Sequence, residues 1–369
     1  MTDERMARKV TERALDLVSG FLDAWAGRSS GLPRQAIERV RRQALRSSHG
    51  GKRLRALLLL DTCQAVAAST ADADRLERPV LDLACALELF QTSVLVHDDL
   101  IDQADLRRGQ PSAQVALNED WSGLTGDMGS NGRRAGSSLA LLMGDLLAAA
   151  ASASADQACE SLPHPHACRQ TFLAMEGQVD QGQVMDLAME SLPLEDPGSL
   201  REAALATIEA KTASYTTVAP LQLGLLAAGR EPELSRSLAR KLGVGLGVAF
   251  QLADDLLDVT EPSAASGKPA CGDIREGKRT VLLADALESA SDGERSRLCD
   301  IYQAPARSQE DVRWAADLFR SSGAIDRASE RIATLRAEAG QALSDFNAVL
   351  NLDEASGRVL AKACDRFLP

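Results

Sequence analysis

Two aspartate motifs contain the residues whose type and spacing could do chemistry. Each has the form DDxxD, and the six carboxylates are Asp98, Asp99, Asp102, Asp254, Asp255 and Asp258. Residues i and i+4 of a helix lie on one face, so the first and last carboxylates of each motif can hold a common cation. Carboxylates about 4 Å apart repel by roughly 4 kcal/mol at an effective dielectric of 20, which favours a bound cation. Donor sets made of carboxylate oxygens indicate Mg²⁺, with Mn²⁺ able to substitute. One such motif alone is more often a solvated helix end, but two copies favour the metal site.

Basic residues in glycine-containing segments lie close to both motifs in the sequence. Mg²⁺ held by carboxylates keeps coordination positions open for phosphates, which need cationic partners. The segment GGKRLR occupies 50–55, and Arg107, Arg108 and Gly109 follow the first motif. Four of the seven lysines fall in Gly-, Thr- or Asp-flanked segments, namely Lys52, Lys211, Lys268 and Lys278. This clustering indicates phosphate contacts, although a solvent-facing helix start and a helix C-cap are the plainer readings of single segments. Two anionic substrates would use both sets of residues: one diphosphate would be bridged by Mg²⁺ to the aspartates, and the other would be held by Arg and Lys without metal.

The elements that must position these residues are helices. Ala, Leu, Glu and Arg dominate, apolar residues recur at i, i+3, i+4 and i+7, and alternating β-branched runs are missing. We therefore predict an all-α protein with one domain over 1–369. The Gly-, Ser- and Asn-rich stretch at about 118–138 is expected to be an inserted loop.

Composition restricts the partners and the compartment. The net charge of −12 and the pI near 5.0 disfavour binding to nucleic acid or to anionic membranes. The longest apolar stretches are far shorter than the ~20 residues of a membrane span, so no stable membrane insertion is expected. The seven cysteines form no CxxC pair and no secretory signal precedes them, which indicates reduced thiols in a cytoplasmic protein.

Seven ordered motifs resemble those of the trans-isoprenyl diphosphate synthase (polyprenyl synthetase) family. They are GGKRLR at 50–55, LFQTSVLVHDDLIDQADLRRGQP at 89–111, GDLL at 144–147, GQVMDLA at 182–188, KTASY at 211–215, FQLADDLLD at 250–258 and GKPACGDIREGKRT at 267–280. The resemblance implies a single large helical bundle with a central cavity, the isoprenoid synthase type, and a homodimer. It also implies that the two DDxxD motifs face each other at the cavity mouth.

The resemblance assigns roles to individual residues. Three Mg²⁺ ions would bridge an allylic diphosphate to Asp98, Asp102 and Asp254, with Asp99, Asp255 and Asp258 contributing directly or through water. The departing allylic diphosphate would be held by Arg107, Lys211 and Lys268. Isopentenyl diphosphate would be bound without metal by Lys52, Arg55, Gln91 and Arg108. A helix break at Lys211 and Thr212, together with Gln251, would direct carbonyl dipoles towards the allylic cation.

The implied activity is condensation of isopentenyl diphosphate with dimethylallyl, geranyl or farnesyl diphosphate by ionisation, condensation and elimination. Chain length would be set by Phe90, Ser93 and Val94, which lie about one to two turns before Asp98, up to ~12 Å below it. Small residues at 93 and 94 with a deeper Phe90 predict mainly C20 geranylgeranyl diphosphate, unless another helix forms the floor. The alternatives are a farnesyl or longer-chain synthase, a class I terpene cyclase and a non-catalytic prenyl synthase subunit. Both aspartate triplets and the basic residues argue against the last two.

Three further positions are noted. Gln114 stands where a His often follows the RRGxP motif in relatives. His97 is interpreted as a helix histidine whose ring has hydrogen-bond partners within the protein. Asp186 is interpreted as a residue that orients other site residues without binding the substrate itself.

Overall fold

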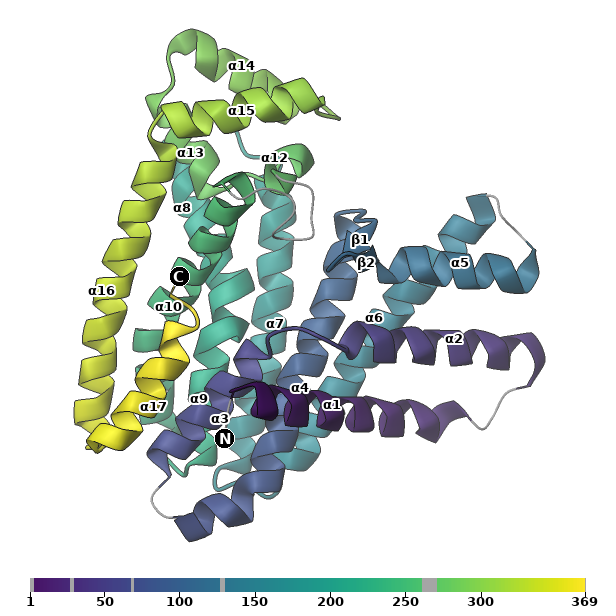
Figure 1. Ribbon diagram of the computed structural model, residues 1–369, viewed down its shortest axis with the longest axis vertical. Coiled ribbons are helices and arrows are strands. Elements are labelled where there is room, and N and C mark those ends of the chain that lie inside the picture. The colour runs from purple at the N-terminus through teal and green to yellow at the C-terminus, as the bar shows by residue number, and fades with distance from the viewer. Residues whose placement is uncertain (1–2, 27–29, 68–69, 127–129, 261–270, 369) are drawn as a thin grey trace. The chain divides into compact units, whose positions relative to one another are not determined.

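The described residues fold almost entirely into helices, as predicted, in the computed structural model shown in Figure 1. The structure describes all residues except 1–2, 27–29, 68–69, 127–129, 261–270 and 369. The fold is all-α, and the one sheet among these residues is a two-stranded hairpin. Contacts divide the chain into two compact units, 1–173 with 223–232 and 174–222 with 233–369. How the two units join, and so the expected single bundle with a central cavity, stays a prediction.

The first unit carries the first aspartate motif. Its elements are α1 (Asp3–Ala26), α2 (Gly31–Ser48), α3 (Leu54–Val66), α4 (Thr70–Ile101), β1 (Leu106–Arg107), β2 (Gln110–Pro111), α5 (Ala113–Thr125), α6 (Ser130–Cys159) and the start of α7 (Pro165–Met189). Helix α4 packs against α6, α3 and α1, and α5 packs against α6. Its buried side chains include Leu83, Leu87 and Leu89. Each fully buried leucine stabilises the fold by about 2 kcal/mol, which fixes the helix that ends in Asp98 and Asp99.

The second unit carries the second aspartate motif. Its further elements are α8 (Pro197–Ile208), η1 (Glu209–Val218), the start of α9 (Ala219–Ala227), whose remaining residues belong to the first unit, α10 (Pro232–Thr260), α12 (Gly272–Glu276), α13 (Val281–Ser289), α14 (Asp292–Gln303), α15 (Gln309–Ser321), α16 (Ala324–Leu350) and α17 (Glu354–Asp365). Asp285 of α13 is fully buried and accepts hydrogen bonds from Arg201 Nε at 2.7 Å and Arg331 Nη1 at 3.1 Å. This ion triad ties α8, α13 and α16 together.

The predicted loop at 118–138 is wrong for the residues that the structure describes there. Helix α5 continues to Thr125, and α6 already begins at Ser130. A Cβ on Gly136 would come within 2.6 Å of the Asn118 Cβ. The glycine therefore serves close packing of α6 against α5, and a composition that favours turns also suits a tight helix–helix contact.

The expected helix break at Lys211 and Thr212 takes the form of a continuous π-helix, η1. Its ten residues join α8 to α9 without interruption. π-helical turns are rare and occur frequently at functional sites, because the wider turn displaces backbone carbonyls and side chains from their α-helical positions.

Within the part of the chain that the structure describes, two helices are long and apolar enough to cross a membrane by length and composition. They cover 76–101 and 134–159, and 72% and 44% of their most apolar windows are buried inside the protein. The first is the central core helix of its unit. The second keeps an apolar face exposed.

Candidate active site

The first aspartate motif ends helix α4 and is followed at once by the β1–β2 hairpin (Figure 1). Leu106 pairs with Pro111 and Arg107 with Gln110, so the turn consists of Arg108 and Gly109 alone. Both turn residues have positive φ, 53° and 71°, as a type I′ turn requires. This tight turn brings Arg107 back beside the carboxylates and places Arg108 beside Gly51.

Arg107 binds the carboxylates directly. Its Nε donates to Asp99 Oδ1 at 2.8 Å, its Nη2 contacts the same oxygen, and Nη2 lies 3.4 Å from Asp98 Oδ2. Burial by itself would lower the pKa of Arg107, but the bond to Asp99 and the neighbouring carboxylate charges raise it. The Asp99 side chain is 4% exposed and that of Asp98 is 17% exposed. Asp98 is thus the more accessible of the two.

Gln114 holds this loop from α5. Its Nε2 donates to the carbonyls of Asp99 at 3.1 Å and Ala104 at 3.0 Å. These two hydrogen bonds fasten the segment after the first motif to α5.

The GGKRLR segment meets the hairpin through its glycines. A Cβ on Gly51 would lie 2.8 Å from Arg108 Nη2. Burial lowers the pKa of Arg108, and the nearby cations Arg53 and Arg107 lower it further. Crowded cations of this kind favour an anionic ligand. The structure therefore places Arg108 beside the loop that contains Lys52 and Arg55.

Arg53, in the same segment, serves the fold. It is buried, its Nη1 lies 3.4 Å from Glu88 Oε2, and its Nη2 donates to the Ser48 carbonyl at 2.5 Å. Gln91, the fourth residue predicted to bind isopentenyl diphosphate, has a buried Oε1 without a hydrogen-bond partner among the described residues. A buried acceptor of this kind is a natural contact for a ligand donor or water.

A cavity of about 560 Å³ lies in the first unit, between the end of α2, the C-terminal part of α4, the hairpin and the start of α5. Its lining includes Asp99, Arg107 and Arg108, but not Lys52, Arg55 or Gln91. Arg108 thus lines the cavity together with Asp99 and Arg107, whereas the other residues predicted to bind isopentenyl diphosphate lie outside its lining.

The residues predicted to set chain length differ in their surroundings. Ser93 donates its hydroxyl to the Gly144 carbonyl of α6 at 2.9 Å, so the buried serine faces that helix. Val94 is half-buried. Phe90 packs edge-to-face on Phe172 of α7, with ring centroids 6.4 Å apart. Phe172 is a partner that sequence reasoning missed, because nothing in the chain marks which aromatic residue meets Phe90.

His97 and Gly144 also pack together. A Cβ on Gly144 would come within 2.2 Å of His97 Nε2, and that nitrogen lies 3.3 Å from Asp145 Oδ1. Because the glycine of the GDLL motif has no side chain, the His97 ring can pack against it. The interpretation of His97 as a satisfied helix histidine agrees with these contacts.

The second aspartate motif lies on α10 and connects to the π-helix. Thr212 Oγ1 donates to Gln251 Oε1 at 3.0 Å, and Gln251 Nε2 donates to Asp255 Oδ1 at 2.8 Å. Burial and the charges of Asp273 and Asp254 raise the pKa of Asp255 well above its usual value, against the opposing bond from Gln251. The predicted residues Thr212, Gln251 and Asp255 therefore form one hydrogen-bonded chain.

Lys211 is held by Asp186, as the supporting role predicted for Asp186 requires. The Lys211 Nζ lies 2.5 Å from Asp186 Oδ2. A Cβ on Gly182 would come within 2.4 Å of the Lys211 backbone nitrogen. The GQVMDLA motif thus supplies both the glycine that admits the π-helix and the carboxylate that orients its lysine.

Asp258 is placed differently from the other aspartates of the motifs. Its Oδ1 accepts from the Gly272 N–H and its Oδ2 from the Asp273 N–H, each at 3.0 Å. Both carboxylate oxygens are thus occupied by the backbone at the start of α12. This contact pattern favours a positioning role over direct metal ligation.

Asp273 is a site residue that sequence reasoning missed. Burial raises its pKa to about 7, the neighbouring Lys278 opposes this, and the charges of Asp258, Glu276 and Asp254 add to it. Lys278 Nζ lies 4.0 Å from Asp273 Oδ1 and 3.0 Å from Glu276 Oε2. The only sequence signal was its place within GDIREGKRT, where an aspartate at a helix start reads as an ordinary capping residue.

Lys268, the remaining predicted contact of the allylic diphosphate, lies outside the described residues. Within the described part of the chain, no three His, Cys, Asp or Glu side chains are grouped as a ready-made metal site. Each unit therefore supplies its carboxylates and cations separately, and the facing of the two DDxxD motifs stays a prediction.

Comparisons with known proteins show the family of this chain. Residues 37–319 match the polyprenyl synthetase family. A geranylfarnesyl diphosphate synthase of Aeropyrum pernix is 31% identical over 284 residues, which cover 76% of this chain and 79% of that protein. A geranylgeranyl diphosphate synthase of Sulfolobus acidocaldarius is 32% identical over 274 residues, 73% of each chain.

A solved structure shares both sequence and fold. The geranylgeranyl pyrophosphate synthase of Corynebacterium glutamicum, complexed with isoprenyl diphosphate and magnesium, superposes with a TM-score of 0.80 at 30% identity over 98% of both chains. The fold and these relatives define an all-α trans-prenyltransferase. The chain belongs to the polyprenyl synthetase family, as a chain-elongating synthase of the geranylgeranyl or geranylfarnesyl type.

Proposed function

We propose that this enzyme condenses isopentenyl diphosphate with dimethylallyl, geranyl and farnesyl diphosphates and releases mainly geranylgeranyl diphosphate. The observation that carries the proposal is the hairpin of the first unit. It sets Arg107 on Asp98 and Asp99 and, one residue later, Arg108 against Gly51 of the GGKRLR loop. Carboxylates for a metal-bound diphosphate thus adjoin cations for a second diphosphate.

The residues fit Mg²⁺. All the donors are carboxylate oxygens, and the pKa values of Asp255 and Asp273 are raised first by burial and then by neighbouring carboxylate charges, both of which a bound cation would oppose. We assign the ions, three by analogy with the family and replaceable by Mn²⁺, to Asp98, Asp102 and Asp254, with Asp99 and Asp255 beside them. When bound, Mg²⁺ would neutralise the charge of the leaving diphosphate.

The protein's own cations and dipoles would bind the two diphosphates and stabilise the allylic cation. Arg107 and Lys211, each already oriented by an aspartate, would bind the oxygens of the departing diphosphate. Lys52, Arg55 and Arg108 would hold isopentenyl diphosphate. The carbonyls of η1 and the Gln251 side chain would stabilise the positive charge of the allylic cation, as preorganised dipoles do.

The C20 product is inferred from the Phe90–Phe172 pair. The two rings pack against each other two turns below Asp98, where an elongating chain would meet them. Farnesyl and geranylfarnesyl diphosphates are the alternatives, because one of the relatives makes a longer product by its name.

We further propose a cytoplasmic homodimer in which α6 packs on its counterpart. Leu141, Leu142 and Leu146 are 51%, 55% and 36% exposed along this helix. An apolar stripe of this kind marks an interaction surface, and a second copy would bury it without membrane insertion.

The direct test is an incubation of the purified enzyme with Mg²⁺, isopentenyl diphosphate and each allylic primer, with the dephosphorylated products sized by chromatography and mass. We expect linear C20 alcohol that disappears with EDTA. Products that stop at C15 or exceed C20 would contradict the chain-length assignment alone. Cyclic hydrocarbon without isopentenyl consumption would indicate a terpene cyclase. No turnover at all would indicate a non-catalytic subunit.

A further inference from the structure

The short helix α12 carries Asp273 and has an anionic partner at its N-terminus. Asp258 accepts the N–H groups of Gly272 and Asp273, and its carbonyl also accepts the Cys271 N–H at 2.9 Å. A carboxylate at this end complements the helix dipole. The last aspartate of the second DDxxD motif thus fixes where α12 begins.

The C-terminus of the same helix has a cationic partner, Arg307, from the segment between α14 and α15. Its Nη1 lies 3.4 Å from the Arg275 carbonyl and 3.3 Å from the Glu276 carbonyl, and its Nη2 donates to the Tyr302 carbonyl at 2.9 Å. The last carbonyls of a helix have no partner within the helix. One guanidinium therefore binds them and ties them to the end of α14.

Gly277 makes this contact possible. Its φ of +79° ends α12 in the left-handed conformation, and a Cβ there would come within 2.1 Å of Arg307 Nη2. Its N–H and that of Lys278 both bond to the Asp273 carbonyl at 2.9 Å. The guanidinium, the glycine and the backbone of Asp273 thus belong to one contact network.

A helix of five residues needs such support. Short helices are marginal in isolation, because nucleation costs more than the few hydrogen bonds return. Helix α12 packs on α15, and α12 to α15 gather at one end of the second unit (Figure 1). Asp273 sits between the two partners, and its Oδ1 lies 4.0 Å from Lys278 Nζ.

We infer that Arg307 is a positioning residue for the second aspartate motif: it holds α12, whose first N–H groups bind Asp258, so that Asp273 and Lys278 keep their places at this motif. The inference rests on the proposed function, since it assigns this cluster to the metal-bound diphosphate. Arg307 itself touches backbone carbonyls and acts through the helix.

The test compares Arg307→Ala with the wild-type enzyme. We expect the Mg²⁺ concentration for half-maximal rate and the KM for the allylic diphosphate to rise about tenfold, as for other groups that orient metal ligands. The KM for isopentenyl diphosphate should stay within about twofold, because Lys52, Arg55 and Arg108 belong to the first unit. Arg307→Lys should recover part of the loss, since it keeps a positive charge at the helix end.

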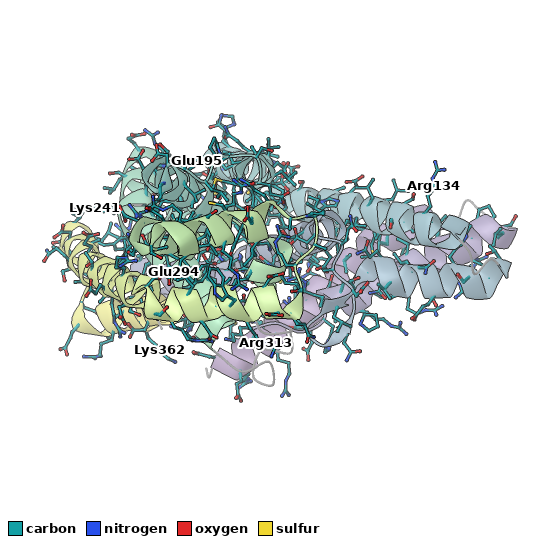
Figure 2. The ribbon with its side chains drawn as sticks, turned by 90° about the horizontal axis from the view of Figure 1, so that it is seen from above. Arg134, Glu195, Lys241, Glu294, Arg313 and Lys362 are labelled. Atoms are coloured by element: carbon teal, nitrogen blue, oxygen red, sulfur yellow. The ribbon has the colours of Figure 1, made fainter. Side chains whose placement is uncertain are left out.

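The matched control is Arg313→Ala. Arg313 is exposed on α15, as Figure 2 shows, and its Nε donates to the Gln309 carbonyl of its own helix at 3.2 Å. This variant should keep the wild-type Mg²⁺ dependence and both KM values. Equal losses in all kinetic constants of Arg307→Ala, together with a fall in Tm, would overturn the inference in favour of a general structural role.

Amide hydrogen exchange provides a readout that does not depend on turnover. In Arg307→Ala the amides of Gly277 and Lys278 should exchange about tenfold faster, while those in α16 stay protected. Unchanged exchange at these two amides would overturn the inference. A wild-type enzyme without prenyl transfer would instead contradict the proposed function, and the exchange data would still decide whether Arg307 holds α12.

Discussion

Gly51 lies directly against the guanidinium of Arg108, so close that a Cβ on the glycine would come within 2.8 Å of Nη2. The φ of Gly51 is +95°, a conformation that other residues adopt only with strain. The glycine therefore lets the basic loop after α2 approach the hairpin after α4. This contact joins two motifs that are more than fifty residues apart in the sequence.

We predict that Gly51→Ala weakens binding of isopentenyl diphosphate. The strained backbone and the displaced guanidinium should raise its KM about tenfold, equivalent to about 1.4 kcal/mol. The KM of the allylic substrate should change less. Steady-state kinetics with each substrate varied in turn would measure both effects.

Gly20→Ala is the control for this substitution. Gly20 lies within α1 and a Cβ there would meet no atom within 4 Å. Alanine in a helix interior is more favourable than glycine by about 1 kcal/mol, so stability should rise slightly with unchanged kinetics. An unaltered isopentenyl KM in Gly51→Ala would show that Arg108 does not hold this substrate.

The accessible carboxylates of the first motif should be essential. Asp98→Ala and Asp102→Ala should each lower kcat by about three orders of magnitude with every allylic primer, because loss of a metal ligand removes several kcal/mol of charge stabilisation. Asp105→Ala, which removes an exposed carboxylate three residues further on, should leave kcat unchanged. Full activity in the first two variants would exclude them as metal ligands.

The residues of the candidate site could be proposed from the sequence because their recognition depends on residue type and local spacing. The DDxxD carboxylates, the RRG arginines and Lys211 are recognisable without knowing what they touch. Helix periodicity also predicted α4 and α10, which end in these motifs. Their partners were less visible. Only the folded chain shows that Asp99 binds Arg107 and that Asp186 binds Lys211.

What the sequence could not reveal are contacts between distant segments. Asp258 matches the motif as well as Asp254 does, yet its oxygens cap α12. Asp273 becomes part of the site only because that helix is held beside α10. Gly136 belongs to a segment whose composition is typical of a loop, yet it forms a helix–helix contact, since Asn118 lies against it. In each case the role of the residue is determined by its contact with a distant segment and not by the local sequence.

The aromatic pair below the first motif should control product length. Phe90→Ala should shift the product beyond C20, because it opens space two turns below Asp98. Loss of the buried ring also costs about 3–5 kcal/mol of stability, so products should be sized at a temperature where the variant stays folded. Phe319→Ala, which removes a buried ring of the second unit, should be similarly destabilised and keep the C20 product. A Phe90→Ala enzyme with an unaltered product distribution would place the floor at another helix.

The exposed face of α6 should join two copies of the chain. Leu142 is 55% exposed, so Leu142→Glu can be accommodated in the monomer, whereas burial of its charge against a second copy would be strongly unfavourable. We expect the wild-type enzyme to sediment as a dimer and Leu142→Glu as a monomer at micromolar concentration. Val349→Glu, at a residue of α16 that is 52% exposed, should remain dimeric. A monomeric wild-type enzyme, or a Leu142→Glu variant that is still dimeric, would exclude this face of α6 as the interface.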